Sequence, residues 1–189
     1  MLQNRFDYRK KTVLEKLDKS SKGNWDKKII KLCYKLNKKK DYYTTSSCAG
    51  RMMLMVDQDK KGPGLFLMVY HNIVSFDKLK SNLIELSKKE KRNIKFKQEP
   101  CIMHVVCRTL DNAWILYDKA KKSGWKRSGL ISWNNSFVLE LMSTEKIEFP
   151  IILNGKILAS DDFLRLVVKK ANENLKKNWG KIEKLKKLI

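Results

Sequence analysis

The sequence predicts an α+β fold with an antiparallel or mixed sheet and the element order ββαββαββ. Three observations support this class. Apolar residues make up 42% of the 189 residues, enough to bury an ordinary core. Short apolar runs bounded by Gly, Pro or Asn alternate with segments of helical spacing. The sequence has neither GxGxxG nor a strict βαβ alternation, so a Rossmann fold is not expected.

We expect a single domain, residues 1–189, made of a helical arm at 1–40, an α+β core at 44–154 and a terminal helix at 160–189. The arm reads as two helices, because Phe6, Val13, Leu14 and Leu17 recur at helical spacing and Asn24 can cap a second helix that carries Trp25, Ile29, Leu32, Cys33 and Leu36. The loop DKSSKGN (18–24) between them offers hydroxyls, backbone donors and two lysines. That composition suits a phosphate as well as an ordinary turn.

Six apolar runs of the core read as strands: 51–56, 65–70, 93–98, 102–107, 127–132 and 137–142. Two helices lie between them, capped by Ser75 and Thr109. We expect the second helix to turn Leu110, Ala113, Trp114, Tyr117 and Ala120 inward. The terminal helix begins at Ser160 and carries an apolar stripe whose other face is rich in lysine: Leu164, Val168, Ala171, Leu175, Trp179, Ile182 and Ile189.

Charge is the strongest global signal. Lys and Arg number 42 against 20 Asp and Glu, a formal net charge of +22. Such an excess attracts polyanions by releasing their condensed counterions, so nucleic acid is the first expected partner. No apolar stretch approaches the length that spans a bilayer, and MLQNRFDYRKK lacks the apolar core of a signal peptide. We therefore expect no membrane, a cytoplasmic location and four reduced cysteines.

The stretch TTSSCAGR (44–51) allows several interpretations. Cys48 could be a nucleophile if His71 or His104 assisted it, or a buried filler at the start of a strand. A zinc site formed by these residues with Cys101 and Cys107 is conceivable by residue type, but no pair has ligand spacing, so no metal is expected.

Anion binding is the third interpretation of this stretch. Gly50 and Arg51 offer an open backbone and a guanidinium, and Ser128-Gly129 and Ser143-Thr144 repeat the small polar chemistry at strand ends. Several such turns could line one cleft. His104, within the strand CIMHVVC, is either a satisfied core side chain or a group that exchanges a proton with a substrate nitrogen.

Several motifs together resemble the tRNA wybutosine-synthesizing protein 3 family. They follow the family's order over nearly the whole chain: DKSSKGNWD (18–26), TTSSCAGR (44–51), FKQEPCIMHVVCR (96–108), SGWKRSGL (123–130), STEKIEFP (143–150) and DDFLRLVVKKANENLKKNWGKIEKL (161–185). The resemblance implies a non-Rossmann α+β methyltransferase. It also implies S-adenosyl-L-methionine as cofactor and N4 of a demethylated tricyclic base at position 37 of tRNA(Phe) as acceptor.

Site roles follow from the resemblance together with the residues. His104 is the candidate for proton handling, with His71 second. We expect cofactor contacts from Ser46, Ser47, Cys48, Gly50, Arg51, Ser128, Gly129, Ser143 and Thr144. We expect contacts with the tRNA anticodon arm from Lys19, Lys22, Lys97, Glu99, Arg108, Lys126 and Arg127.

The sequence departs from the family pattern at several positions. Ala49 stands where a serine is common, Gln98 replaces a phenylalanine, and Met142 and Glu145 replace an arginine and a histidine. Lys126-Arg127 stands for Arg-Asn, and these cations can compensate in part for the lost arginine. Two rival functions stay open: a non-catalytic basic RNA-binding protein and a cysteine-dependent hydrolase.

Overall fold

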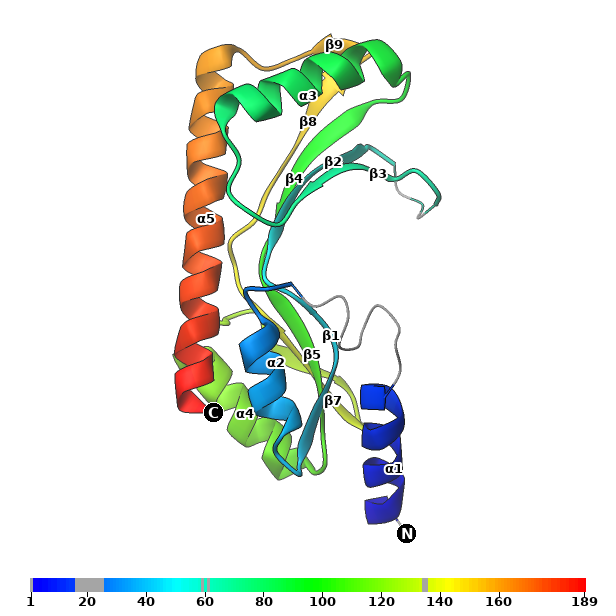
Figure 1. The fold of residues 1–189 in the computed structure, drawn as a ribbon, viewed down its shortest axis with the longest axis vertical. Coiled ribbons are helices and arrows are strands. Elements are labelled where there is room, and N and C mark those ends of the chain that lie inside the picture. The colour runs from blue at the N-terminus through cyan, green and yellow to red at the C-terminus, as the bar shows by residue number, and fades with distance from the viewer. Residues whose placement is uncertain (1, 16–25, 59, 61, 134–135) are drawn as a thin grey trace. The chain divides into compact units, whose positions relative to one another are not determined.

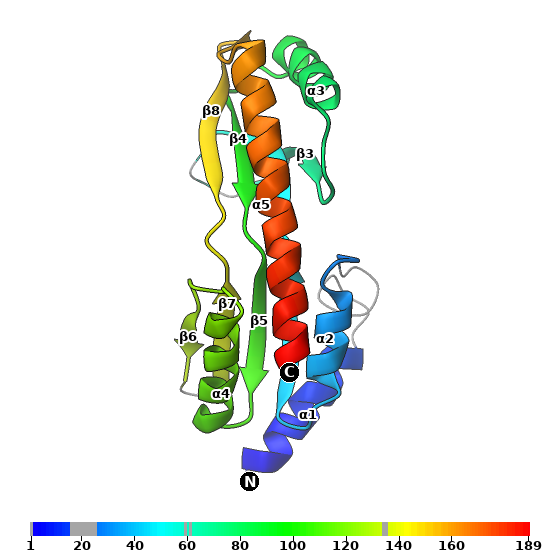
Figure 2. The ribbon, with the colours of Figure 1, turned by 90° about the vertical axis from the view of Figure 1, so that its left-hand side faces the viewer.

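The computed structural model describes residues 2–15, 26–58, 60, 62–133 and 136–189 (Figures 1 and 2). In chain order the elements are α1 (Leu2–Glu15), α2 (Ile30–Asn37), β1 (Tyr42–Cys48), β2 (Arg51–Val56), β3 (Phe66–Tyr70), α3 (Phe76–Lys89), β4 (Ile94–Glu99), β5 (Ile102–Cys107), α4 (Leu110–Lys122), β6 (Gly129–Ser132), β7 (Phe137–Met142), β8 (Ile147–Leu153), β9 (Lys156–Ile157) and α5 (Asp161–Leu188). Every strand pairing described is antiparallel. The α+β, non-Rossmann class is confirmed.

The chain divides into two compact units, each assembled from separate segments. The first unit comprises residues 1–49, 101–144 and 178–189, and the second comprises 50–100 and 145–177. The α5 helix therefore supplies residues to both.

The first unit is a four-stranded sheet in the order β1-β5-β7-β6. One face, here called the helix face, is covered by α2, α4 and the last turns of α5, which bury residues such as Leu32, Leu116 and Ile182 against Met103 and Leu139. Side chains alternate across a strand, so the neighbours of these sheet residues point to the opposite face.

The opposite face of this sheet is here called the α1 face, because α1 packs on it (Figure 1). Phe6 of α1 contacts Tyr43 and Val106, and the Phe6 and Tyr43 ring centroids lie 5.2 Å apart in an edge-to-face arrangement. This contact fixes the helix at the β1–β5 edge of the face.

The second unit is a five-stranded sheet in the order β3-β2-β4-β8-β9. Aromatic rings join α5 to this sheet, since Phe163 packs on Phe149, which in turn packs on Phe96, with centroid distances of 5.5 and 5.4 Å. The α3 helix packs beside α5, with the Arg165 guanidinium 3.8 Å from the centroid of the Phe76 ring. Met53 and Met55 form a smaller apolar cluster with Leu65.

The helix caps predicted at Ser75, Thr109 and Ser160 are confirmed. The hydroxyl oxygens of Ser75, Thr109 and Ser160 accept hydrogen bonds from the backbone N–H three residues on, at 3.2, 3.1 and 3.3 Å. The apolar stripe of α5 is also as expected, with Leu164, Val168, Ala171, Leu175 and Ile182 all buried.

Other expectations were wrong in detail. TTSSC is itself part of strand β1, although its hydroxyl residues suggested a polar turn, and β8 and β9 extend the ββαββαββ order. The strand expected at 127–132 begins only at Gly129. Leu110 and Trp114 are not inward: they are 55% and 69% exposed, because Ala113 and Leu116 occupy the buried face of α4.

Some expectations lie outside the described residues. These are the loop 18–24 with Lys19, Lys22 and Asn24, and the side chains of Leu17 and Trp25. The helix that Asn24 was expected to cap begins only at Ile30, after Ile29, which makes no side-chain cap bond. Among the helices that are described, each is too short or too polar to cross a membrane.

Candidate active site

Three polar side chains form a lateral row across the α1 face of the first sheet. Ser46 on β1 is the register partner of His104 on β5, which is the partner of Glu140 on β7, and Gly129 on β6 lies opposite Glu140. Residues directly opposite one another on adjacent strands point to the same face. The register therefore brings a hydroxyl, an imidazole and a carboxylate together from segments distant in sequence.

Hydrogen bonds connect the row from end to end. Ser46 Oγ lies 2.8 Å from His104 Nδ1, and His104 Nε2 lies 2.8 Å from Glu140 Oε2. An ionised carboxylate can only accept, so Nε2 carries the proton in the neutral ring and Nδ1 accepts from the Ser46 hydroxyl. The Ser46 oxygen then keeps lone pairs for another donor. Ser46 is exposed, and the His104 and Glu140 side chains are each 29% exposed.

Glu140 was not among the residues expected at the site. A carboxylate inside the apolar strand FVLELM is unusual. Glu140 lies two residues after Val138, so the two side chains point to the same face of the sheet. Its pairing with His104 depends on the register of β7 against β5, which no local pattern specifies.

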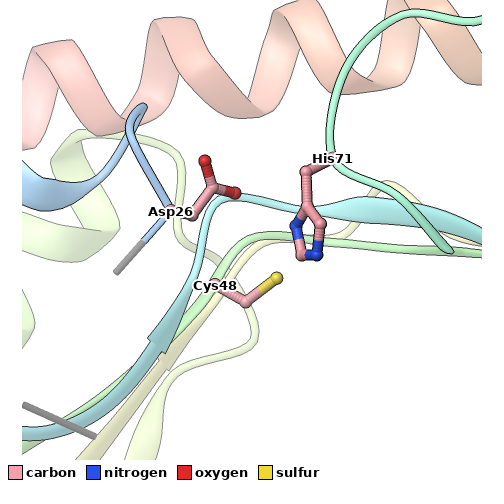
Figure 3. A group of neighbouring side chains, drawn as sticks. All are labelled: Asp26, Cys48 and His71. Atoms are coloured by element: carbon pink, nitrogen blue, oxygen red, sulfur yellow. The ribbon is translucent and has the colours of Figure 1, made fainter. Parts of the chain in front are cut away.

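Asp26, which precedes α2, lies near Cys48 at the end of β1 (Figure 3). Cys48 follows Ser46 by two residues on β1 and so shares its face. The Asp26 carboxylate lies within 4.8 Å of the Cys48 sulfur, and its Oδ2 accepts from the Ala49 backbone N–H at 3.3 Å. A carboxylate at this distance repels a thiolate, which opposes a nucleophilic role for Cys48, and it favours a cation over an anion.

The other cysteines are directed away from this face. Cys33, Cys101 and Cys107 are buried in the helix-face core, and none of the four cysteines, all within the described ranges, forms a disulfide. Burial raises the pKa of the Cys33 thiol to about 11 and that of Cys107 to about 12. Because Cys101 and Cys107 face the core and His104 faces the other side, the conceivable zinc set is not brought together.

Several of the small polar residues have partners within the fold. Ser47 Oγ lies 3.4 Å from the Cys33 sulfur, which donates to it. Ser128 Oγ donates to the Trp125 carbonyl at 2.7 Å and accepts from the Met142 backbone N–H at 3.2 Å. These bonds hold the two serines in structural roles.

Ser143 and Thr144, which follow β7, are placed differently. Ser143 is fully buried and its hydroxyl is bonded to Asn178 Oδ1 on α5, whereas Thr144 is exposed. Ser143 is therefore a core residue, and only Thr144 presents its side chain to solvent.

The second unit holds the remaining candidates of the TTSSCAGR motif. Gly50 has φ of +94°, a conformation that glycine adopts without strain. Arg51 forms a salt bridge with Glu99 at 2.9 Å, and Lys97 binds the other oxygen of the same carboxylate at 3.1 Å. His71, also labelled in Figure 3, is exposed directly after β3.

The expected RNA-binding cations of the first unit fall into two groups. The Arg108 guanidinium donates to Asp41 at 3.0 Å, Asp7 at 3.2 Å and the Lys40 carbonyl at 2.9 Å, and it stacks 4.4 Å from the Phe6 ring centroid. It therefore anchors α1. Lys126 and Arg127 are exposed and form no ion pair with any residue the structure describes.

Gln98, one of the departures from the family pattern, is buried with hydrogen-bond partners for its side chain. Gln98 replaces a phenylalanine yet is fully buried in the second unit. Its amide oxygen accepts from Asn174 at 2.9 Å, and its amide nitrogen donates to the carbonyls of Glu99 and Glu145 at 2.9 and 3.1 Å. All its polar groups are thus satisfied.

Comparisons with known proteins agree with this architecture. The family model described as "Methyltransferase TYW3" matches residues 8–189. An Archaeoglobus fulgidus protein named tRNA(Phe) 7-((3-amino-3-carboxypropyl)-4-demethylwyosine(37)-N(4))-methyltransferase is 33% identical, covering 96% of this chain and 91% of its own. The Bos taurus "tRNA wybutosine-synthesizing protein 3 homolog" is 31% identical, covering 93% and 69%.

A solved structure shares the fold. The PH1069 protein from Pyrococcus horikoshii superposes with a TM-score of 0.86 at 29% identity, covering 98% of this chain and 94% of its own. With the family model spanning nearly every residue, the expected resemblance is confirmed, and the chain belongs to the methyltransferase TYW3 family.

Proposed function

We propose that this chain methylates N4 of 7-(3-amino-3-carboxypropyl)-4-demethylwyosine at position 37 of tRNA(Phe). The reaction is the transfer of one methyl group to a ring nitrogen. The names of the archaeal relatives support this substrate. The observation that carries the proposal is the Ser46–His104–Glu140 row, because it supplies an acceptor for the proton that the nitrogen must lose.

The row moves a proton in a defined direction. Ser46 Oγ accepts the proton of the acceptor nitrogen as its own hydroxyl proton passes to His104 Nδ1. The imidazolium so formed lies between Ser46 and the Glu140 carboxylate, which stabilises its charge. Ser46 is thus the contact residue, His104 the base and Glu140 the group that holds the ring and its tautomer.

S-adenosyl-L-methionine, the proposed cofactor, supplies a methyl group on a positively charged sulfonium. The first unit fits a cation of this kind, because the Asp26 carboxylate lies beside Cys48 and a second carboxylate, Glu140, shares the α1 face. We propose that Asp26, Ser46 and Cys48 hold the cofactor there. Gly50, Arg51, Gly129 and Thr144 stay predictions for the same role, while Ser47, Ser128 and Ser143 support the fold around it.

The positive surface is the proposed contact for the tRNA anticodon arm. Of the expected RNA-binding residues described in the first unit, Lys126 and Arg127 are better placed than Arg108, since neither forms an ion pair with an acidic neighbour among the described residues. Lys19, Lys22, Lys97 and Glu99 stay predictions for this role, as does a cytoplasmic location. Binding should weaken steeply with salt, because phosphate contacts release counterions.

Mass spectrometry of tRNA(Phe) carrying the demethylated base tests the function. Incubation with the protein and S-adenosylmethionine should add one methyl group to that nucleoside, and His104→Asn should lose most of the activity while binding tRNA normally. Binding without any methyl gain would instead support the non-catalytic RNA-binding alternative. Cys48→Ser should only weaken transfer, because the nitrogen attacks the methyl carbon directly; complete loss, with tRNA binding intact, would favour a catalytic thiol.

A further inference from the structure

A mostly apolar cavity opens on the helix face of the first unit, between α4 and strands β6 and β7. Its volume is about 670 Å³, within the range of small-ligand pockets. Leu130 and Leu139 form its floor, while Leu110, Trp114 and Tyr117 line it from α4. Leu130 and Leu139 are register partners and turn away from the α1 face, so the cavity is separate from the Ser46–His104–Glu140 row.

An aromatic stack forms one wall of this cavity. The Trp114 and Tyr117 rings lie 5.4 Å apart between centroids with an interplanar angle of 19°. Tyr117 is partly buried against the core, whereas Trp114 is 69% exposed. Tyr117 therefore holds the indole in place while most of its surface stays open to a further flat ring.

Cations lie at the rim beside the stack. Lys121 Nζ lies 5.3 Å from the Tyr117 ring centroid and donates to the Lys126 carbonyl at 2.7 Å, which fixes the start of the 126–128 turn. Lys126 and Arg127 follow there, exposed, and Ser128 then enters the cavity wall. An aromatic platform next to unneutralised cations is the arrangement that binds single-stranded nucleic acid.

We propose that this cavity binds one unstacked nucleobase of the RNA, stacked on Trp114, with neighbouring phosphates on Lys126 and Arg127. Asp111, on the cavity rim, can accept from a base amino group or a ribose 2′-hydroxyl. The inference rests on the proposed function in that RNA is the partner. A second copy of the chain fits less well, because a symmetric contact would bring the same cations of two molecules of charge +22 together.

Binding of unmodified tRNA(Phe) transcript across a salt series tests the proposal. Trp114→Ala should weaken binding about 5- to 150-fold, the size of one lost stacking contact, with the salt slope unchanged. Trp114→Phe should retain most of the affinity. Arg127→Ala should lower the slope of log K against log salt by about one. Ile115→Ala, an equally apolar exposed residue next in sequence and outside the cavity lining, is the matched control.

Ultraviolet crosslinking with peptide mapping adds a direct readout. The wild-type protein should give an RNA adduct on the Trp114–Tyr117 peptide, and Trp114→Ala should lose it. If the protein methylates the tRNA but Trp114→Ala binds it as tightly as the wild type does, the nucleobase site is overturned and the proposed function stands. Failure of the wild-type protein and of every variant to bind tRNA would overturn both the nucleobase site and the proposed function. A dimer in sedimentation that Trp114→Ala dissociates, with tRNA binding unchanged, would assign the cavity to a second copy instead.

Discussion

His104 Nε2 and Glu140 Oε2 lie 2.8 Å apart across the β5–β7 ladder, and both side chains are 29% exposed. The carboxylate has no proton to give, so this contact selects the His104 tautomer that leaves Nδ1 facing Ser46. The orientation of the base is therefore set by a neighbouring strand.

Glu140→Gln should lower kcat for methyl transfer about 10-fold or more with little change in KM, because the amide cannot stabilise the imidazolium. The chain has only two histidines, so ¹⁵N spectra of labelled protein resolve their ring nitrogens, and the His104 tautomer ratio should change in this variant. Glu85→Gln, an exposed carboxylate paired with Lys89 on α3, is the control. An unchanged tautomer ratio would remove Glu140 from the mechanism.

Arg108→Gln should detach α1 rather than weaken RNA binding at phosphates. The guanidinium holds Asp7, Asp41 and the Phe6 ring, and it keeps the pKa of Asp7 below its usual value. Hydrogen exchange of residues 5–15 should accelerate, while the salt slope of tRNA binding stays at the wild-type value. A slope reduced by about one, as expected for Arg127→Gln, would mean that Arg108 contacts a phosphate.

The Cys107 thiol should make stability fall at alkaline pH. Its pKa is raised from 9.0 to about 12 by burial, so the unfolded state loses its proton first. The free energy of unfolding is unaffected by this group below pH 9 and decreases from there until the folded thiol ionises near pH 12. Urea unfolding at pH 8 and pH 10 should show a smaller decrease for Cys107→Val than for the wild type. Equal decreases would show that the thiol is not the group responsible.

Asn178→Ala should destabilise the fold by about 1–3 kcal/mol, because it leaves the buried Ser143 hydroxyl without its acceptor. Denaturant unfolding measures the loss. Lys176→Ala, an exposed substitution on the same helix, should stay within about 0.5 kcal/mol of the wild type. A double-mutant cycle with Ser143→Ala should reveal a coupling energy of about 0.5 kcal/mol or more, and additivity would argue against this bond.

We propose that the chain unfolds as one domain, although it contains two compact units. The polypeptide passes from one unit to the other at residues 49–50, 100–101, 144–145 and 177–178, the last of these inside α5. Circular dichroism and tryptophan fluorescence should therefore give coincident transitions. Two separated transitions would identify the units as independent domains.

Local sequence features were enough to predict the helices, because caps at Ser75, Thr109 and Ser160 and apolar spacing are short-range properties. They did not predict β1, where hydroxyl residues pair with β5 at the edge of a sheet rather than form a turn. Ala113 and Leu116 occupy the buried face of α4, whereas Trp114 lies on its exposed face. Helical periodicity alone does not distinguish these two faces.

The residues of the candidate site also fall into those that the local sequence predicts and those that only the tertiary structure reveals. His104 could be named from its strand and from the family resemblance, and Ser46 from the TTSSCAGR motif. Glu140 and Asp26 could not be named from local patterns, because Glu140 meets His104 through the β5–β7 register and Asp26 meets Cys48 from a segment 22 residues earlier in the chain. Arg108 was a reasonable candidate for RNA binding and Ser143 for cofactor binding by residue type. Both are bonded to other residues of the protein, Asp41 and Asn178, which only the tertiary structure shows.

Because the Ser46–His104–Glu140 row depends on the pairing of three strands, methyl-transfer activity also depends on the strand register. Side chains alternate across β5, so a shift of one residue against β1 and β7 would turn His104 into the core and bring Met103 to the face. The same slip would bury an imidazole among apolar side chains and expose the sheet's main packing residues. Turnover by a preparation therefore reports the fraction of molecules with correctly aligned strands, which spectroscopic secondary-structure content does not distinguish.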